Sequence, residues 1–269
     1  MSKTIYRHEF RLRARSIIIW SVSVAAMVIF FLSIFPAFAD QAALMNQLMA
    51  RFPPQLLAAF GMNRVDLSTV LGFYSFVFIF VQLCLAVQAA NYGFGLVSVE
   101  ESELTADFLL TRPVSRTQVL TSKLLAAVSS LLVTDIVVWI GSVVGILAWH
   151  GSRSFDSAML VELMLVLVPF QLLFMAVGLV ISLLVKRVRS VTPYSLGLAF
   201  GAYVLAGFSG LFGDVKLEYI TPFKHMDPTY FVQHGAYDMP LLLLDLGIIL
   251  VSVAASYRLY LRRDIQAVS

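Results

Sequence analysis

The sequence VEESELTADFLLTRPVSRTQVLTSK, residues 99–123, is the longest charged passage between two strongly apolar blocks of this chain. Its charged residues are Glu100, Glu101, Glu103, Asp107, Arg112, Arg116 and Lys123. Thr105 and Asp107 suit the first turn of a helix, where exposed amides favour hydroxyl and acidic side chains. Phe108, Leu109 and Leu110 then supply an apolar face. Because Pro113 lacks an amide hydrogen and disfavours helix at Arg112, we predict a short amphipathic helix that ends there.

Ser115 follows this turn and is suited to cap a second helix that continues into the next apolar block. Residues 99–123 are therefore predicted to form a helix at the membrane surface, a turn, and the start of a helix that enters the membrane again. The same residues also fit an ordinary solvated loop, and the local pattern alone leaves both interpretations open.

The composition of the whole chain predicts an integral membrane protein. Its 269 residues are 59% hydrophobic and 13% charged, and the mean hydropathy is +0.87. Soluble domains carry about 25% charged residues, so much of this surface must face lipid. The net charge of +3 fits membrane topology better than nucleic-acid binding, and we expect no nucleic-acid partner. Cys84 is the single cysteine, which excludes an internal disulfide.

Apolar segments of about 20 residues predict an all-α fold that spans the bilayer six times. The expected spans are about 17–39, 68–90, 123–149, 159–185, 191–213 and 240–261, within a single transmembrane domain, residues 1–269. Residues 1–16 mix basic and apolar side chains, which indicates an amphipathic interfacial helix before the first span. This full-length first span is not the pattern of a cleavable signal peptide.

The distribution of basic residues predicts the orientation. Of the 19 lysines and arginines, 14 lie in the N-terminal segment, the 91–123 segment, the 186–190 turn and the C-terminal tail. Because basic residues favour the cytoplasmic side, we expect both termini and residues 99–123 in the cytoplasm, with the protein in the inner or plasma membrane.

Asp135, about halfway along the third span, is the clearest ionisable residue inside the membrane. It fits either a proton or cation site or a structural group bonded to Gln82, Gln88 or Gln171, and the structural interpretation is favoured because no span offers a basic partner. Glu162 and Asp245 lie near the outer ends of their spans, where we expect them to be solvated.

Two glycine pairs place small residues on one helix face, Gly141 with Gly145 and Gly197 with Gly201. Such pairs permit close packing within a subunit or between subunits, and Gly197 and Gly201 are the better candidates for dimer packing. The chain has no G-x-x-x-x-G-K-[ST] sequence and no metal-ligand cluster. We therefore expect no catalytic, metal or cofactor site, and any ATP-driven work must use another subunit.

Three features make the chain resemble permease subunits of the ABC-2-type exporters. The stretch from Glu101 to Arg116, continuing to Ser122-Lys123, resembles the segment between the second and third spans of that family. The tail Arg262-Arg263-Asp264-Ile265 resembles the ending after the sixth span, and residues 221–228 resemble the outer segment before it. Glu103 departs from the pattern, since many relatives carry a small or basic residue there.

The resemblance implies a transporter of two permease subunits and two ATPase subunits, with ATP and magnesium bound in the ATPases. Residues 99–122 would be the coupling segment, with its helix around residues 100–111 seated in a groove of the ATPase. Its contacts would come from Glu100, Glu101, Glu103, Thr105, Asp107, Phe108, Leu109, Leu110, Arg112 and Arg116. The N-terminal amphipathic helix would also rest at the ATPase. Closure of the ATPase dimer would tilt the first, second and fifth spans and open a path between the permease subunits.

Two other functions stay open from the sequence. One is a standalone secondary transporter that uses Asp135 as an ion site, and the other is a membrane scaffold that docks a protein without moving a substrate. The outer loops are too short for a substrate-binding domain, which favours export over import. The substrate, and whether the permease dimer is homo- or heteromeric, do not follow from the residues.

Overall fold

The computed structural model describes residues 1–49, 51–53, 57, 65–102, 114–185, 190–208 and 219–262, and in these parts the chain is helical without a strand. Its long helices are α1 (Lys3–Asp40), α4 (Val70–Ser102), α6 (Arg116–Trp149), α8 (Leu167–Leu184), α9 (Val191–Phe208) and α12 (Met239–Arg262). Shorter helices are α2 (Ala42–Met49), α7 (Ser157–Leu165), α10 (Pro222–His225) and α11 (Pro228–His234). Within the described residues, six stretches are long and apolar enough to cross a membrane, with α7 and α8 together forming the fourth.

The first span and the N-terminal segment form one continuous helix. We expected a separate interfacial helix over residues 1–16, but α1 runs from Lys3 to Asp40 without a break. Residues 3–35 contain no proline or glycine to interrupt it, and Pro36 stands only in its last turns. At about 1.5 Å per residue, 38 residues reach about 57 Å, well beyond a hydrocarbon core of about 30 Å. The basic segment is therefore an extension of the span.

The second span also extends beyond its predicted end at residue 90. Helix α4 continues to Ser102, so residues 99–102 are its last turn and not the start of a new helix. The fourth span is interrupted between α7 and α8, after Leu165. Pro169 explains this break, because it cannot donate a hydrogen bond to the carbonyl of Leu165 four residues earlier. The predicted end of the fifth span, residues 209–213, lies outside the described residues.

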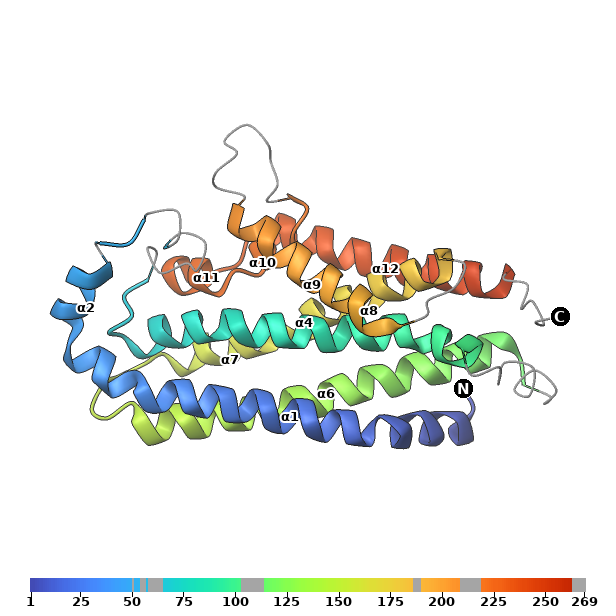
Figure 1. Ribbon diagram of the computed structural model, residues 1–269, viewed down its shortest axis with the longest axis horizontal. Coiled ribbons are helices and arrows are strands. Elements are labelled where there is room, and N and C mark those ends of the chain that lie inside the picture. Colours follow the sequence, from blue (N-terminus) through green and yellow to red (C-terminus); the bar gives the residue numbers. More distant parts are fainter. Residues whose placement is uncertain are drawn as a thin grey trace.

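Two helix pairs form the frame of the bundle (Figure 1). Helices α1 and α6 run parallel, because Tyr6 bonds Ser129 near one end and Asp40 pairs with Arg153 at the other. Helix α4 is the most enclosed span and packs chiefly against α8 and α9, while α12 lies on α8. A Cβ at Gly93 of α4 would collide with the backbone carbonyl of Met175, so glycine permits this close crossing.

The segment before the sixth span packs into the bundle. Phe223 of α10, Phe231 of α11 and Met226 between these helices are all buried. The ring of Phe223 contacts Phe170 of α8 with centroids 5.1 Å apart, and Gln82 of α4 donates to the Met226 carbonyl at 2.8 Å. These contacts make the segment part of the core, at the end of the bundle opposite the N-terminus (Figure 1).

Candidate functional site: the coupling region

The predicted coupling segment lies between the end of α4 and the start of α6. Glu100 and Glu101 belong to the last turns of α4, and Arg116 is the first residue of α6. The other predicted coupling residues lie outside the described residues: Glu103, Thr105, Asp107, Phe108, Leu109, Leu110 and Arg112. The structure therefore describes the two supports of the segment, and the segment's own fold stays a prediction.

The start of α6 agrees with the predicted cap. Ser115 has an extended backbone, and its Oγ accepts a hydrogen bond from the Gln118 amide at 3.3 Å. This side chain satisfies one of the amide groups that a helix leaves unpaired in its first turn. The helix that enters the bundle consequently begins at Arg116.

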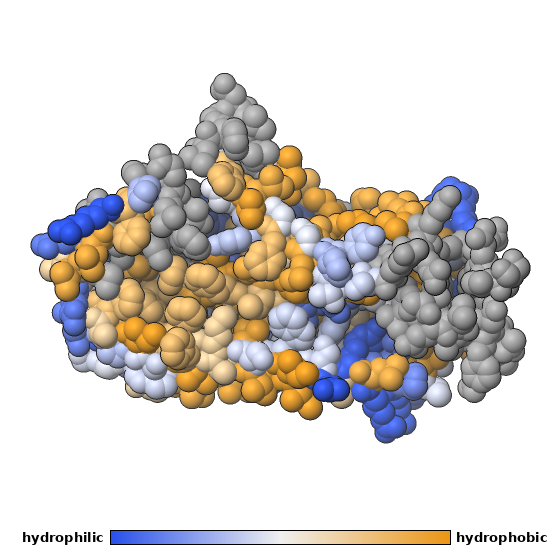
Figure 2. All heavy atoms as spheres, in the orientation of Figure 1, coloured by the Kyte–Doolittle hydropathy of each residue, from blue (hydrophilic) through white to orange (hydrophobic). Residues whose placement is uncertain are grey.

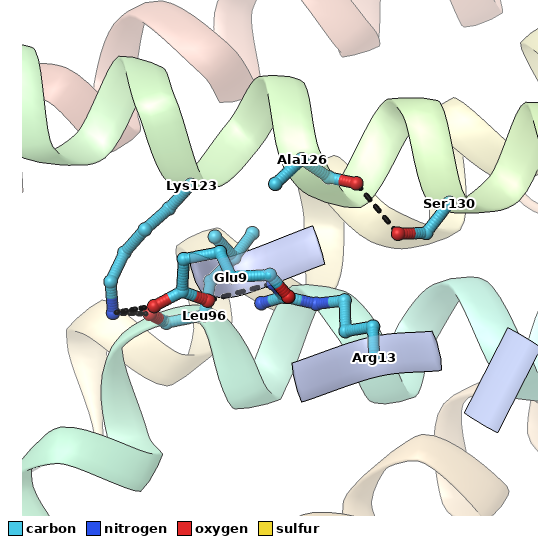
Figure 3. A network of polar contacts seen from close by, with 6 residues as sticks. All are labelled: Glu9, Arg13, Leu96, Lys123, Ala126 and Ser130. Atoms are coloured by element: carbon cyan, nitrogen blue, oxygen red, sulfur yellow. Dashed lines mark hydrogen bonds and ion pairs between the residues drawn. The ribbon is translucent and has the colours of Figure 1, made fainter. Parts of the chain in front are cut away.

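Lys123 connects both supports of the coupling segment to α1 (Figure 3). Its Nζ donates to the Leu96 carbonyl of α4 at 2.8 Å and lies 3.7 Å from Oε1 of Glu9 in α1. The side chain is buried, although it belongs to the first third of α6. A buried ammonium is unfavourable without such partners. Lys123 therefore joins α1, α4 and α6 at the base of the segment, and we name Glu9, Leu96 and Lys123 the three-helix clasp.

Arg13 extends the clasp along α1. Its Nη1 donates to Oε2 of Glu9 at 2.7 Å, so one carboxylate faces two cations. The Arg13 guanidinium also lies over the ring of Tyr92 in α4, with its carbon 5.7 Å from the ring centroid. A cation over an aromatic face is attracted to its electron-rich surface. These contacts explain why Arg13 faces inward while its basic neighbours do not.

Two further hydrogen bonds fix the first turns of α1 against α6. The amide of Ser2 donates to Oγ of Ser122 at 2.8 Å, and the Tyr6 hydroxyl donates to Oγ of Ser129 at 3.0 Å. The extension of α1 beyond its apolar segment is thus packed along α6 and not free to lie apart from the bundle.

Polar contacts continue from the clasp into the membrane. The Tyr92 hydroxyl donates to Oγ of Ser16, and Gln88 donates to Oγ1 of Thr134 at 2.9 Å. Six residues further along α4, or about 1.7 helical turns, Gln82 donates to the Met226 carbonyl. Buried hydrogen bonds are therefore spaced along α4 from Leu96 to Gln82.

Asp135 lies fully buried, and Nε2 of Gln171 in α8 donates to its Oδ1 at 2.9 Å. Gln171 is one of the three partners that the sequence suggested. The contact joins α6 to α8 as the structural interpretation expects. Among the residues that the structure describes, no group of three or more metal-ligating side chains is present.

The sequence expectation for Asp245 is wrong. We expected both Glu162 and Asp245 to be solvated, and Glu162 is exposed, but Asp245 is fully buried. Its Oδ1 lies 2.8 Å from Nδ1 of His225 in α10. The reason is tertiary, because α10 folds into the bundle and brings a histidine to the inner face of α12.

The two glycine pairs have different surroundings. A Cβ at Gly141 of α6 would lie 3.1 Å from Ala25, and a Cβ at Gly145 would lie 2.6 Å from Leu32. Both neighbours belong to α1, so this glycine pair packs within the subunit. In the described part of the chain, a Cβ at Gly197 or Gly201 of α9 would meet no atom within 4 Å. Their face of α9 is open, as a surface for another subunit would require.

Sequence reasoning missed the three-helix clasp. Two signals were available: Glu9 is the only acid among the five basic residues of the N-terminal segment, and Lys123 begins an apolar run. Each signal suggests a buried charge, but neither names its partner. The pairing became visible only when the helices were placed side by side.

The comparison with protein-family models agrees with a membrane-spanning helical fold. The model of the ABC-2 family transporter protein matches residues 3–265, nearly the whole chain. No curated protein matched this sequence. A family match of this extent, on a chain with six helices able to span a membrane, identifies the protein class. The chain therefore belongs to the ABC-2 family of transporter proteins and is a transmembrane ABC permease.

Proposed function

We propose that this permease is the transmembrane subunit of an ATP-driven exporter, pairs with a second permease subunit, and is driven by a separate ATPase subunit. The family match supports transport, and the absence of a phosphate-binding G-x-x-x-x-G-K-[ST] sequence supports hydrolysis elsewhere. ATP and magnesium would be bound by that ATPase. Both supports of the coupling segment, together with the N-terminus, lie at one end of the bundle, which we propose is cytoplasmic (Figure 1).

The three-helix clasp is the observation that carries this proposal. The coupling segment joins α4 to α6, and Lys123 bonds α4 and pairs with α1 directly beneath it. A force on the segment would therefore reach three spans together. The resemblance implies that ATP-driven closure of the ATPases tilts the first and second spans, α1 and α4. Since rigid elements with buried contacts move as units, α6 would move with these two helices as one body.

The substrate path would form between two permease copies. Helix α9 is one of the most exposed spans, and its open glycine face allows close approach of a second helix. Relative movement of the two subunits would then open and close the path. Whether the second copy is identical to this one is left to experiment.

Affinity purification of the tagged chain in mild detergent, followed by mass spectrometry and an ATPase assay, tests the proposal. We expect a stoichiometric ATPase to co-purify. Replacing Phe108 and Leu109 with glutamates should uncouple hydrolysis from transport, because it places charges on the predicted apolar anchor of the coupling helix. The spans should stay folded.

A matched control places the same charges at the other end of the bundle. Leu44→Glu with Leu48→Glu alters two exposed leucines of α2 and should leave coupling intact. Normal coupling in the Phe108 and Leu109 variant would contradict the assignment of the coupling helix.

The same purification separates the alternative functions. A chain without an ATPase, combined with loss of transport in Asp135→Asn, would support an ion-coupled secondary transporter. An ATPase that binds without any substrate movement would support a scaffold. The contact with Gln171 favours a structural role for Asp135. If that role is correct, Asp135→Asn should leave transport intact, because the asparagine oxygen can still accept the hydrogen bond from Gln171.

A further inference from the structure

Helix α1 carries an exposed basic face that the clasp does not use. Arg7, Arg11 and Arg15 follow at intervals of four residues, so they lie along one side of the helix. All three are exposed, and no ion pair links them to another described residue. Arg13, by contrast, points inward to Glu9. The segment thus separates one neutralised inner arginine from an outer line of cations.

This line continues directly into the apolar surface of the same helix. Ile18 and Val22 follow Arg11 and Arg15 at helical spacing and are 62% and 60% exposed. In a membrane-spanning helix, exposed isoleucine and valine must contact lipid or another apolar surface. Figure 2 shows hydrophilic atoms close to apolar ones near this end of the molecule. Arg11 and Arg15 therefore lie on the same side of α1 as these lipid-facing residues.

The depth of each arginine follows from helix geometry. The apolar run begins at Ile17, and a rise of about 1.5 Å per residue places Arg15 about 3 Å, Arg11 about 9 Å and Arg7 about 15 Å beyond it. The headgroup layer on each side of the hydrocarbon core is about 5–8 Å thick. Arg15 lies within this layer, Arg11 reaches it with a long side chain, and Arg7 lies outside it.

We propose that Arg11 and Arg15 form a binding site for the headgroup of an anionic phospholipid in the leaflet at the N-terminal end of α1. A guanidinium fork binds a phosphate with two parallel hydrogen bonds, and the apolar face of Ile18 and Val22 receives the acyl chain. A second copy of the chain is a poor occupant, because its own arginines would meet these at the same depth and repel them.

Val22→Trp places a reporter on the face of α1 that carries the arginines, because Trp20 lies on the opposite side of the helix and packs against the core. The full chain with this change, and with Trp20, Trp139 and Trp149 changed to phenylalanine, is reconstituted in phosphatidylcholine vesicles containing either brominated phosphatidylglycerol or brominated phosphatidylcholine. Quenching of the tryptophan at position 22 should show phosphatidylglycerol preferred about fivefold for each arginine, the equivalent of about 1 kcal/mol per basic residue. A chain that keeps only Trp149, at the opposite end of α6, should show no preference that depends on these arginines.

Substitutions rank the three arginines. Arg15→Gln should reduce the preference, Arg11→Gln with Arg15→Gln should abolish it, and the matched control Arg7→Gln should leave it unchanged. Lysine at both positions should retain most of it, because the charge is kept. Phosphatidylglycerol that co-purifies with the chain, measured by mass spectrometry with all tryptophans present, gives a second reading if the tryptophan variants fold poorly.

Three results would overturn the proposal. Equal quenching by both lipids in the reporter chain with all three arginines intact would exclude a specific headgroup site. If Arg7→Gln reduced the phosphatidylglycerol preference as much as Arg15→Gln, the effect would be one of general surface charge. Loss of a co-purifying ATPase in the double variant, with the lipid preference intact, would assign this face to the ATPase.

Discussion

Lys123→Met is the most direct test of the three-helix clasp, because methionine keeps the apolar stem and removes the ammonium. The lost hydrogen bond to the Leu96 carbonyl has a charged donor and a length of 2.8 Å, which corresponds to about 1.5–3 kcal/mol of unfolding free energy. Glu9 is not stranded by the change, since its 2.7 Å contact with Arg13 remains. The loss should therefore stay below the about 3–5 kcal/mol that an uncompensated buried charge costs.

A double-mutant cycle with Glu9→Gln separates the contact of Lys123 with Leu96 from its contact with Glu9. Glu9 and Lys123 are 3.7 Å apart without a hydrogen bond, and Coulomb's law with an effective dielectric constant of about 20 gives about 4–5 kcal/mol before the opposing cost of desolvation. Since the Leu96 contact does not need Glu9, we expect Lys123→Met to cost about 1 kcal/mol or more even in the Glu9→Gln background.

Equilibrium unfolding of the full chain in mixed detergent micelles, followed by circular dichroism, measures these free energies. Lys3→Met is the matched control, because Lys3 is exposed at the same end of α1 and should change stability by less than about 0.5 kcal/mol. The clasp would be refuted if Lys123→Met were no more destabilising than Lys3→Met. If Lys123→Met cost nothing in the Glu9→Gln background, the role of the Leu96 contact would be refuted, but not the contact between Lys123 and Glu9.

Three further predictions use the same unfolding assay. Gly93→Ala should destabilise the protein by about 1–3 kcal/mol or more, because the new Cβ would collide with the Met175 carbonyl. Gly197→Ala is the control and should not destabilise it, because its Cβ would meet no neighbour in the described chain. Equal effects of the two variants would contradict the α4–α8 crossing. Asp245→Ala should cost about 2–5 kcal/mol, because it removes the buried carboxylate that lies 2.8 Å from Nδ1 of His225. Glu162→Ala, at an exposed site, should be nearly neutral. Burial, with a contribution from the negative charge of Asp227, raises the pKa of Tyr237 above its ordinary value of about 10. The unfolded chain then loses this proton at lower pH than the folded chain, so stability should fall as pH rises above about 10, and Tyr237→Phe should lessen that fall.

The family match and the six membrane-crossing stretches were both predictable from local sequence. A run of about 20 apolar residues is long enough for a bilayer whatever it packs against, and Ser115 caps a helix through its own next residues. The position of Asp135 within its span also follows from counting. For these features, the residues that decide the outcome lie close together in the chain.

The sequence could not decide where the polar groups find partners. Three glutamines were possible partners of Asp135, and the way α6 lies against α8 selects Gln171. Asp245 looked solvated by its place near a span end, yet the entry of α10 into the bundle buries it beside His225.

The sequence by itself determined the membrane class, the number of spans, the start of α6 and the family of this protein, because hydrophobic transfer and helix capping are local properties. Only the tertiary structure decided that α1 continues through the basic segment packed on α6, and that Lys123 joins α1 to α4. Those outcomes depend on which helix faces meet. That choice is made by contacts between residues more than a hundred positions apart, such as Glu9 and Lys123, whose energies no local pattern contains.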